Sequence, residues 1–218
     1  MVETIATWRP TPADRITLVR AALTAACAVL AVPPLFAGQV PGQVPGQVPG
    51  PGTGLLLVIL GSTALLLDAV DGRVARRTGT ASEAGARFDS ATDAFLVLVL
   101  SVATVTVVGL WTLTIGAMYY VVAAAGLVRP HLREPLPRST ARKVIGAVQP
   151  LALLLALVTA LVPGMPPALA AAAPAVALPL LLFSFGRDVV ALERRHVTSG
   201  AASRTATPRA ATARGPAA

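Results

Sequence analysis

Six apolar stretches alternate with polar segments along the chain. They cover about residues 16–37, 54–74, 88–110, 112–128, 144–162 and 168–185. Each approaches the roughly 20 residues that a helix needs to cross about 30 Å of hydrocarbon. Since a backbone in lipid must satisfy its own hydrogen bonds, helices are the expected structure. The pattern therefore predicts an all-α fold, an integral membrane bundle of six transmembrane helices.

The polar segments differ in charge. Every Lys and Arg lies in residues 1–20, 71–87, 129–143 or 187–218. The intervening connections have no charged residue: 38–53, 109–113 and 162–168. Because positively charged segments stay on the cytoplasmic side, this alternation predicts that both termini face the cytoplasm. We therefore expect a protein of the cell (cytoplasmic) membrane, and its Ala-, Arg- and Pro-rich composition indicates a bacterial source.

The chain is expected to form one domain, residues 1–197. Within it, residues 38–53 contain three copies of Gly-Gln-Val-Pro, which predict a flexible external loop because Pro and Gly oppose helix and sheet. The tail 198–218 is rich in Ala, Ser, Thr, Arg and Pro, and is expected to be a disordered basic cytoplasmic tail. Its arginines would contact anionic membrane lipids.

Composition narrows the class of protein further. The chain is 55% hydrophobic and 13% charged, with a net charge of +8 and a mean hydropathy of +0.71. Aromatic residues make up only 4%, and no basic stripe with interleaved aromatics occurs, so no nucleic-acid partner is expected. Cys27 is the single cysteine, which excludes an intrachain disulfide.

Four of the six aspartates lie at the edges of apolar stretches. Asp68 and Asp71 are three residues apart, and Asp89 and Asp93 are four apart. On a helix, both spacings place the paired side chains on one face. The first pair ends the second stretch and the second pair begins the third, so both pairs should lie at the cytoplasmic edge and face one another.

Four adjacent carboxylates repel one another, and each charge inside a membrane costs up to about 2.5–3.5 kcal/mol. Mg²⁺ or Mn²⁺ would relieve this repulsion, because both ions favour carboxylate oxygens. Two such ions would suit a diphosphate ligand. The alternative is that these aspartates only form interfacial salt bridges with arginines. The two helical spacings and the small residues between the aspartates favour the metal site over this alternative.

The complete pattern resembles the signature of the CDP-alcohol phosphatidyltransferases. The matching residues are Asp68-x2-Asp71-Gly72-x2-Ala75-Arg76-x8-Gly85-x3-Asp89-x3-Asp93. The six-helix layout is similar as well. Thr17 and Arg20 match a weaker family pattern in the first helix, but Asp14 stands where that pattern has Asn.

The resemblance implies an activity and a role for each motif residue. Family members use an alcohol to displace CMP from a CDP-linked lipid, usually CDP-diacylglycerol. By resemblance, Asp68, Asp71 and Asp89 would ligate the metals, and Asp93 would complete the site and act as general base. The cytidine diphosphate would be surrounded by Asp68, Asp71, Gly72, Ala75, Arg76 and Gly85. A homodimer is also implied.

The acceptor alcohol is less defined by the sequence. A basic cluster between the fourth and fifth stretches comprises Arg129, Arg133, Arg138, Arg142 and Lys143. Such a cluster could bind the phosphate of glycerol 3-phosphate or an inositol phosphate, or it could only follow the positive-inside pattern. Two other functions stay open: a cation-coupled transporter, in which intramembrane acids mark the path, and a catalytically inactive relative of the family.

Overall fold

The computed structural model describes residues 12–33, 51–78, 83–129 and 140–205, with side chains for 15–33, 52–70, 85–129 and 140–196. These residues form helices without any strand. The elements are α1 (Pro12–Ala31), α3 (Pro51–Thr78), α4 (Glu83–Val108), the short 3-10 helix η1 (Leu110–Thr112), α5 (Leu113–Val128), α6 (Thr140–Leu161) and α7 (Pro167–Thr205). The prediction of an all-α membrane bundle is confirmed.

Five of these helices are long and apolar enough to cross a membrane. The segments concerned are Gly52–Val70, Gly85–Val108, Leu110–Val128, Thr140–Leu161 and Pro167–His196. The first helix, α1, has 20 residues but carries Asp14, Arg15 and Arg20, and it is not among the five. The cytoplasmic placement of the two termini stays a prediction.

Two predicted boundaries differ from the structure. The helix α3 begins at Pro51, inside the loop predicted for 38–53, and the remainder of that loop lies outside the described residues. The helix α7 continues to Thr205, so the first part of the tail predicted for 198–218 is helical; residues 206–218 lie outside the described residues. The apolar pattern ends near residue 185, but backbone hydrogen bonds continue the helix into polar sequence.

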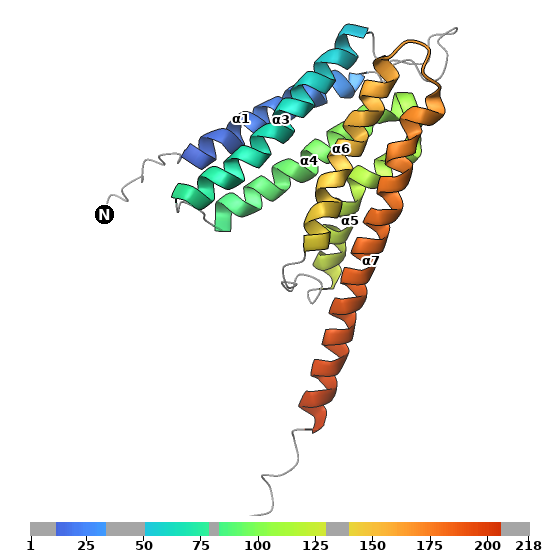
Figure 1. The fold of residues 1–218 in the computed structure, drawn as a ribbon. Coiled ribbons are helices and arrows are strands. Elements are labelled where there is room, and N and C mark those ends of the chain that lie inside the picture. The colour runs from blue at the N-terminus through green and yellow to red at the C-terminus, as the bar shows by residue number, and fades with distance from the viewer. Residues whose placement is uncertain (1–11, 34–50, 79–82, 130–139, 206–218) are drawn as a thin grey trace, which may run out of the picture.

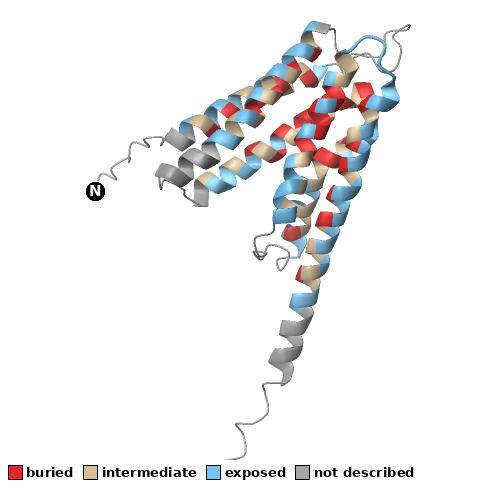
Figure 2. Ribbon diagram, in the orientation of Figure 1, coloured by how far each residue is buried: buried red, intermediate tan, exposed pale blue. Residues whose placement is uncertain are grey.

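The helix α4 is the centre of the bundle. It contacts α1, α5, α6 and α7, while α1 also packs along α3, and α6 packs along α7. The core contains Leu57, Leu100, Leu153 and Leu157, each fully buried. Figure 2 shows that the buried positions gather along α4 and the helices that cross it. In Figure 1, α1, α3 and α4 diverge from α5, α6 and α7 toward one end, and α7 extends well beyond the others.

Candidate active site

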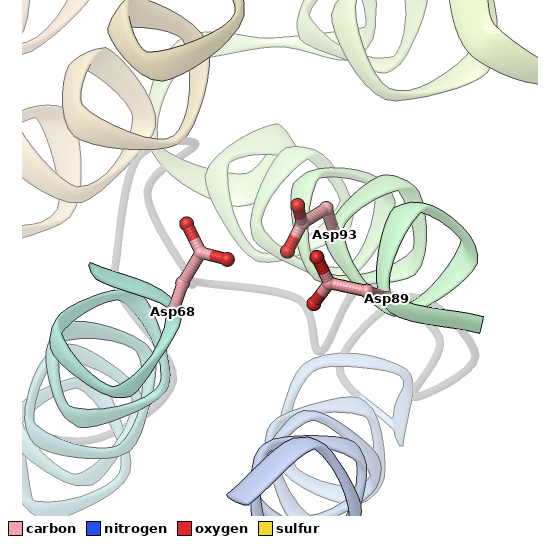
Figure 3. A group of neighbouring side chains, drawn as sticks. All are labelled: Asp68, Asp89 and Asp93. Atoms are coloured by element: carbon pink, nitrogen blue, oxygen red, sulfur yellow. The ribbon is translucent and has the colours of Figure 1, made fainter. Parts of the chain in front are cut away.

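Three of the four motif aspartates converge in space. Asp68 comes from α3, and Asp89 and Asp93 come from successive turns of α4. One carboxylate oxygen from each lies within 4.8 Å of the others. Figure 3 shows the three side chains pointing toward one another across the space between the two helices. The predicted approach of the two helix faces is therefore present for these three residues.

The remaining motif residues lie on the same two helices. The last turns of α3 contain Asp71, Gly72, Ala75 and Arg76. These turns lie beyond the part of α3 whose side chains the structure describes. Gly85 lies in the first turn of α4, one turn before Asp89. The order of residues along the helices thus places the whole motif at the end of the bundle where α3 ends and α4 begins.

Arg20 of α1 lies at the centre of the carboxylate cluster. Its side chain is only 1% exposed, and its Nη2 lies 3.0 Å from Asp68 Oδ1. It also donates hydrogen bonds to Asp89 Oδ1 from Nη1 and to Asp93 Oδ1 from Nη2. Because α1 packs against both α3 and α4, Arg20 joins the two halves of the motif.

Sequence reasoning assigned no role to Arg20. The signal was present, since an arginine inside an apolar stretch is costly unless it is paired. Its partners lie 69 and 73 residues away at Asp89 and Asp93, a separation that no local pattern reveals. Thr17 and Arg20 are three residues apart, a spacing that places both side chains on one face of a helix. Both side chains are buried in the structure.

The charges of this cluster suit a divalent cation. Arg20 offers one positive charge to three carboxylates, so these four groups together keep an excess of negative charge when ionised. The three aspartates are only partly buried, which leaves their oxygens accessible from outside the bundle. Hard divalent ions take such oxygen ligands. The residues present therefore fit a metal ion.

A cavity of about 460 Å³ opens beside the cluster. It lies between α3, α4 and α6, and Asp68 and Asp93 form part of its wall. Lys143, from the first turn of α6, is the other charged residue in the described lining. A molecule held in this cavity could reach both the carboxylate of Asp93 and the ammonium group of Lys143.

The other residues of the predicted basic cluster have different surroundings. Arg142 forms an ion pair with Asp188 of α7, in which Nε lies 2.7 Å from Oδ2. Arg129, at the end of α5, donates a hydrogen bond of 2.7 Å to Glu193 of α7. Arg133 and Arg138 lie outside the described residues. The structure thus brings Lys143 to the carboxylate site and directs Arg129 and Arg142 toward α7.

Comparison with known families agrees with this architecture. The model of the CDP-alcohol phosphatidyltransferase family matches residues 11–183, which is most of the chain. The protein therefore belongs to the CDP-alcohol phosphatidyltransferase family. This is a family of transferases of substituted phosphate groups that move a phosphatidyl group from a CDP-alcohol. A search of curated proteins found no match to the chain.

Proposed function

We propose that this protein transfers the phosphatidyl group of CDP-diacylglycerol to an alcohol acceptor and releases CMP, as a step of phospholipid biosynthesis at the cytoplasmic face of the membrane. The observation that carries this proposal is the convergence of Asp68, Asp89 and Asp93 beside a cavity that also contains Lys143. An active site at the end of the bundle suits a donor whose acyl chains lie in lipid and whose headgroup lies in water.

Asp68, Asp71, Asp89 and Asp93 would hold two divalent ions, Mg²⁺ or Mn²⁺. When bound, these ions would neutralise the diphosphate oxygens and stabilise the departing CMP. Gly72, Ala75 and Gly85 would leave room for the cytidine diphosphate, and Arg76 would add a positive charge near its phosphates. Arg20 would keep the aspartates of α3 and α4 together through the contacts it makes to both helices.

Asp93 is the proposed general base. It lines the cavity, so an acceptor hydroxyl bound there lies within reach of its carboxylate. The acceptor oxygen attacks the phosphorus that carries the lipid, the new P–O bond forms, and the P–O bond to CMP breaks. The hydroxyl proton passes to Asp93. Because attack is direct, no covalent intermediate with the protein is required.

Lys143 is the best supported of the proposed acceptor-phosphate residues. Its place in the cavity wall would allow its ammonium group to bind a phosphate on the acceptor, such as that of glycerol 3-phosphate or an inositol phosphate. The proposed basic cluster also contains Arg129, Arg133, Arg138 and Arg142. Of these, Arg129 and Arg142 pair with acidic residues of α7. We also propose that the protein acts as a homodimer.

The decisive experiment measures CMP release by the purified protein. The assay contains CDP-diacylglycerol, Mg²⁺ or Mn²⁺, and a panel of acceptors with and without a phosphate. We expect CMP release with one acceptor, and a fall of at least about 100-fold in kcat for Asp93→Asn, because general-base catalysis typically contributes 10²–10⁴-fold.

Two controls make this result specific. Gly186→Ala changes an open position of α7 outside the cavity, and it should keep near wild-type turnover. Asp93→Asn should still bind CDP-diacylglycerol. Normal turnover by Asp93→Asn would exclude it as the base, and the absence of CMP release with every acceptor would indicate an inactive relative.

A further inference from the structure

The lining of the cavity beside the aspartates is charged at one end and apolar at the other. Asp68 and Asp93 line it at the level of the carboxylate cluster, and Leu65 and Leu96 line it one helical turn further into the bundle. The contribution of α6 changes in the same direction, from Lys143 through Gly146 to Pro150. A ligand with an anionic group can therefore reach Asp93 while it places that group near Lys143 and its remainder along α6.

Gly146 leaves open space in the wall of this cavity. A Cβ atom built at Gly146 would meet no neighbouring atom within 4 Å. This contrasts with Gly116, where a Cβ atom would lie 2.6 Å from Leu98 Cα. The glycine at 146 is thus not required for helix packing, and its absent side chain adds room to the cavity.

Pro150 changes the hydrogen bonding of the same wall. In an α-helix, the N–H of residue 150 would bond to the carbonyl of residue 146. Pro150 lies inside α6 and has no N–H, so it cannot make this bond to Gly146. Both residues line the cavity. Within a membrane-spanning helix, a carbonyl freed by proline needs another donor.

We propose that Gly146 and Pro150 determine which acceptor alcohol this enzyme uses, an inference that rests on the proposed function. Gly146 provides the space for the acceptor, and its carbonyl, released by Pro150, accepts a hydrogen bond from an acceptor hydroxyl. Lys143, one turn earlier and about 4.5 Å along the helix axis, binds the anionic group of the same molecule. The acceptor class that fits is a small polyol with one phosphate.

The charge of the cavity supports a single anionic group on the acceptor. Among the described lining residues, Lys143 is the one cation, so the lining supplies a counter-charge for one anionic group on the acceptor. The apolar end of the lining offers no polar side chain to further phosphates, so it disfavours an acceptor with several charged groups.

The first test narrows the cavity with Gly146→Val. Its effect is measured as the KM for glycerol 3-phosphate and for inositol 1-phosphate, and as the KM for CDP-diacylglycerol. We expect the acceptor KM to rise by about tenfold or more, with a larger rise for the larger polyol, because even one methylene in a pocket typically changes selectivity by 10–200-fold. The donor KM should change less than about twofold. Gly186→Val is the matched control, since Gly186 also faces open space but lies on α7 outside this cavity.

The second test returns the missing N–H with Pro150→Ala. This change should strengthen the helix, so a loss of folding is not expected. Because the Gly146 carbonyl would then bond within α6, we expect the acceptor KM to rise about 3–10-fold, as for the loss of one hydrogen bond. Pro179→Ala, which changes an exposed proline inside α7, is the control.

The outcomes separate this inference from the proposed function. Glycerol 3-phosphate and inositol 1-phosphate are also added to the proteins without donor, and the shift in thermal unfolding reports binding without turnover. The inference is supported if both variants weaken acceptor binding while the controls do not. The inference is overturned if the acceptor KM and the thermal shift are unchanged in both variants, or if neither acceptor binds the wild type. It is also overturned if the donor KM rises instead of the acceptor KM, because that result would place an acyl chain of the donor in the cavity. Wild-type protein that releases no CMP contradicts the proposed function by a separate result.

Discussion

At the scale of single residues, Arg20 is the side chain that connects the parts of the site. It is 1% exposed and contacts carboxylates from α3 and α4. An arginine held this way neutralises part of the repulsion between Asp68, Asp89 and Asp93. Removing one partner of a buried ion pair leaves the other charges without compensation, which is costly. Arg20 is therefore expected to act as a positioning residue for the aspartates.

This role predicts a metal-dependent stability defect in Arg20→Met. Without added metal, the free energy of unfolding should fall by about 3 kcal/mol, the low end for breaking a buried ion pair, because the aspartates are only partly buried. Mg²⁺ should stabilise the variant more than the wild type, since the cation replaces the lost positive charge. Thermal unfolding with and without Mg²⁺ measures both effects.

A purely packing role for Arg20 would give a different result, in which Mg²⁺ shifts both proteins equally. Arg129→Met is the matched control. Arg129 pairs with Glu193 but is 63% exposed, so its loss should cost no more than about 1 kcal/mol and should not change the response to Mg²⁺.

At the scale of the helices, close contact between α4 and α5 depends on one glycine. A Cβ atom at Gly116 would lie 2.6 Å from Leu98 Cα and 2.8 Å from Ser101 Oγ. The serine side chain can rotate, but the backbone of α4 cannot move without separating the helices. The turn before α5 is tied to the same region, because the Thr112 hydroxyl donates a hydrogen bond to the Ser101 carbonyl. Small residues at helix contacts allow this approach in membranes.

Gly116→Ala is therefore expected to destabilise the bundle by about 1–3 kcal/mol, as overpacking typically does. The result is specific because alanine favours a helix over glycine by about 1 kcal/mol where space is available. Gly186→Ala, at an open position on α7, should be neutral or slightly stabilising. Thermal unfolding in detergent compares the two variants, and equal stability of both would contradict the close α4–α5 contact.

At the scale of the whole molecule, the surface is that of a protein in lipid. Leu66, Leu127 and Phe183 are each about two-thirds exposed or more, a surface that lipid would cover and water would not. The helix α7 spans the bundle and continues past it (Figure 1). From Pro167 to His196 it is about 44 Å long, which exceeds the roughly 30 Å of the hydrocarbon core.

The predicted orientation of the chain can be tested at the two ends of α7. Met165 is exposed in the turn before this helix, and His196 is exposed near its far end. A membrane-impermeant maleimide added to intact cells should label Met165→Cys, and should label His196→Cys only after the membrane is permeabilised. The single natural cysteine, Cys27, is fully buried and should give little background. If only His196→Cys is labelled in intact cells, the orientation of the chain in the membrane is the opposite of the predicted one.

The amino-acid sequence by itself determined the helical class, the approximate spans and the aspartate motif. These features depend on short-range periodicity: apolar runs of about 20 residues, and acidic side chains three and four residues apart on one helix face. The spacing of four residues placed Asp89 and Asp93 on one face of α4, and Asp68 of α3 lies close to both.

Only the tertiary structure decided which distant side chains join that motif. Arg20 meets partners about 70 residues away, and Arg142 and Lys143, neighbours in sequence, point to different places: one to Asp188 of α7, the other to the cavity. The open space at Gly146 also depends on how α3, α4 and α6 pack. The physical reason is that helix periodicity acts between near neighbours, whereas ion pairs and cavities form where separate helices happen to meet.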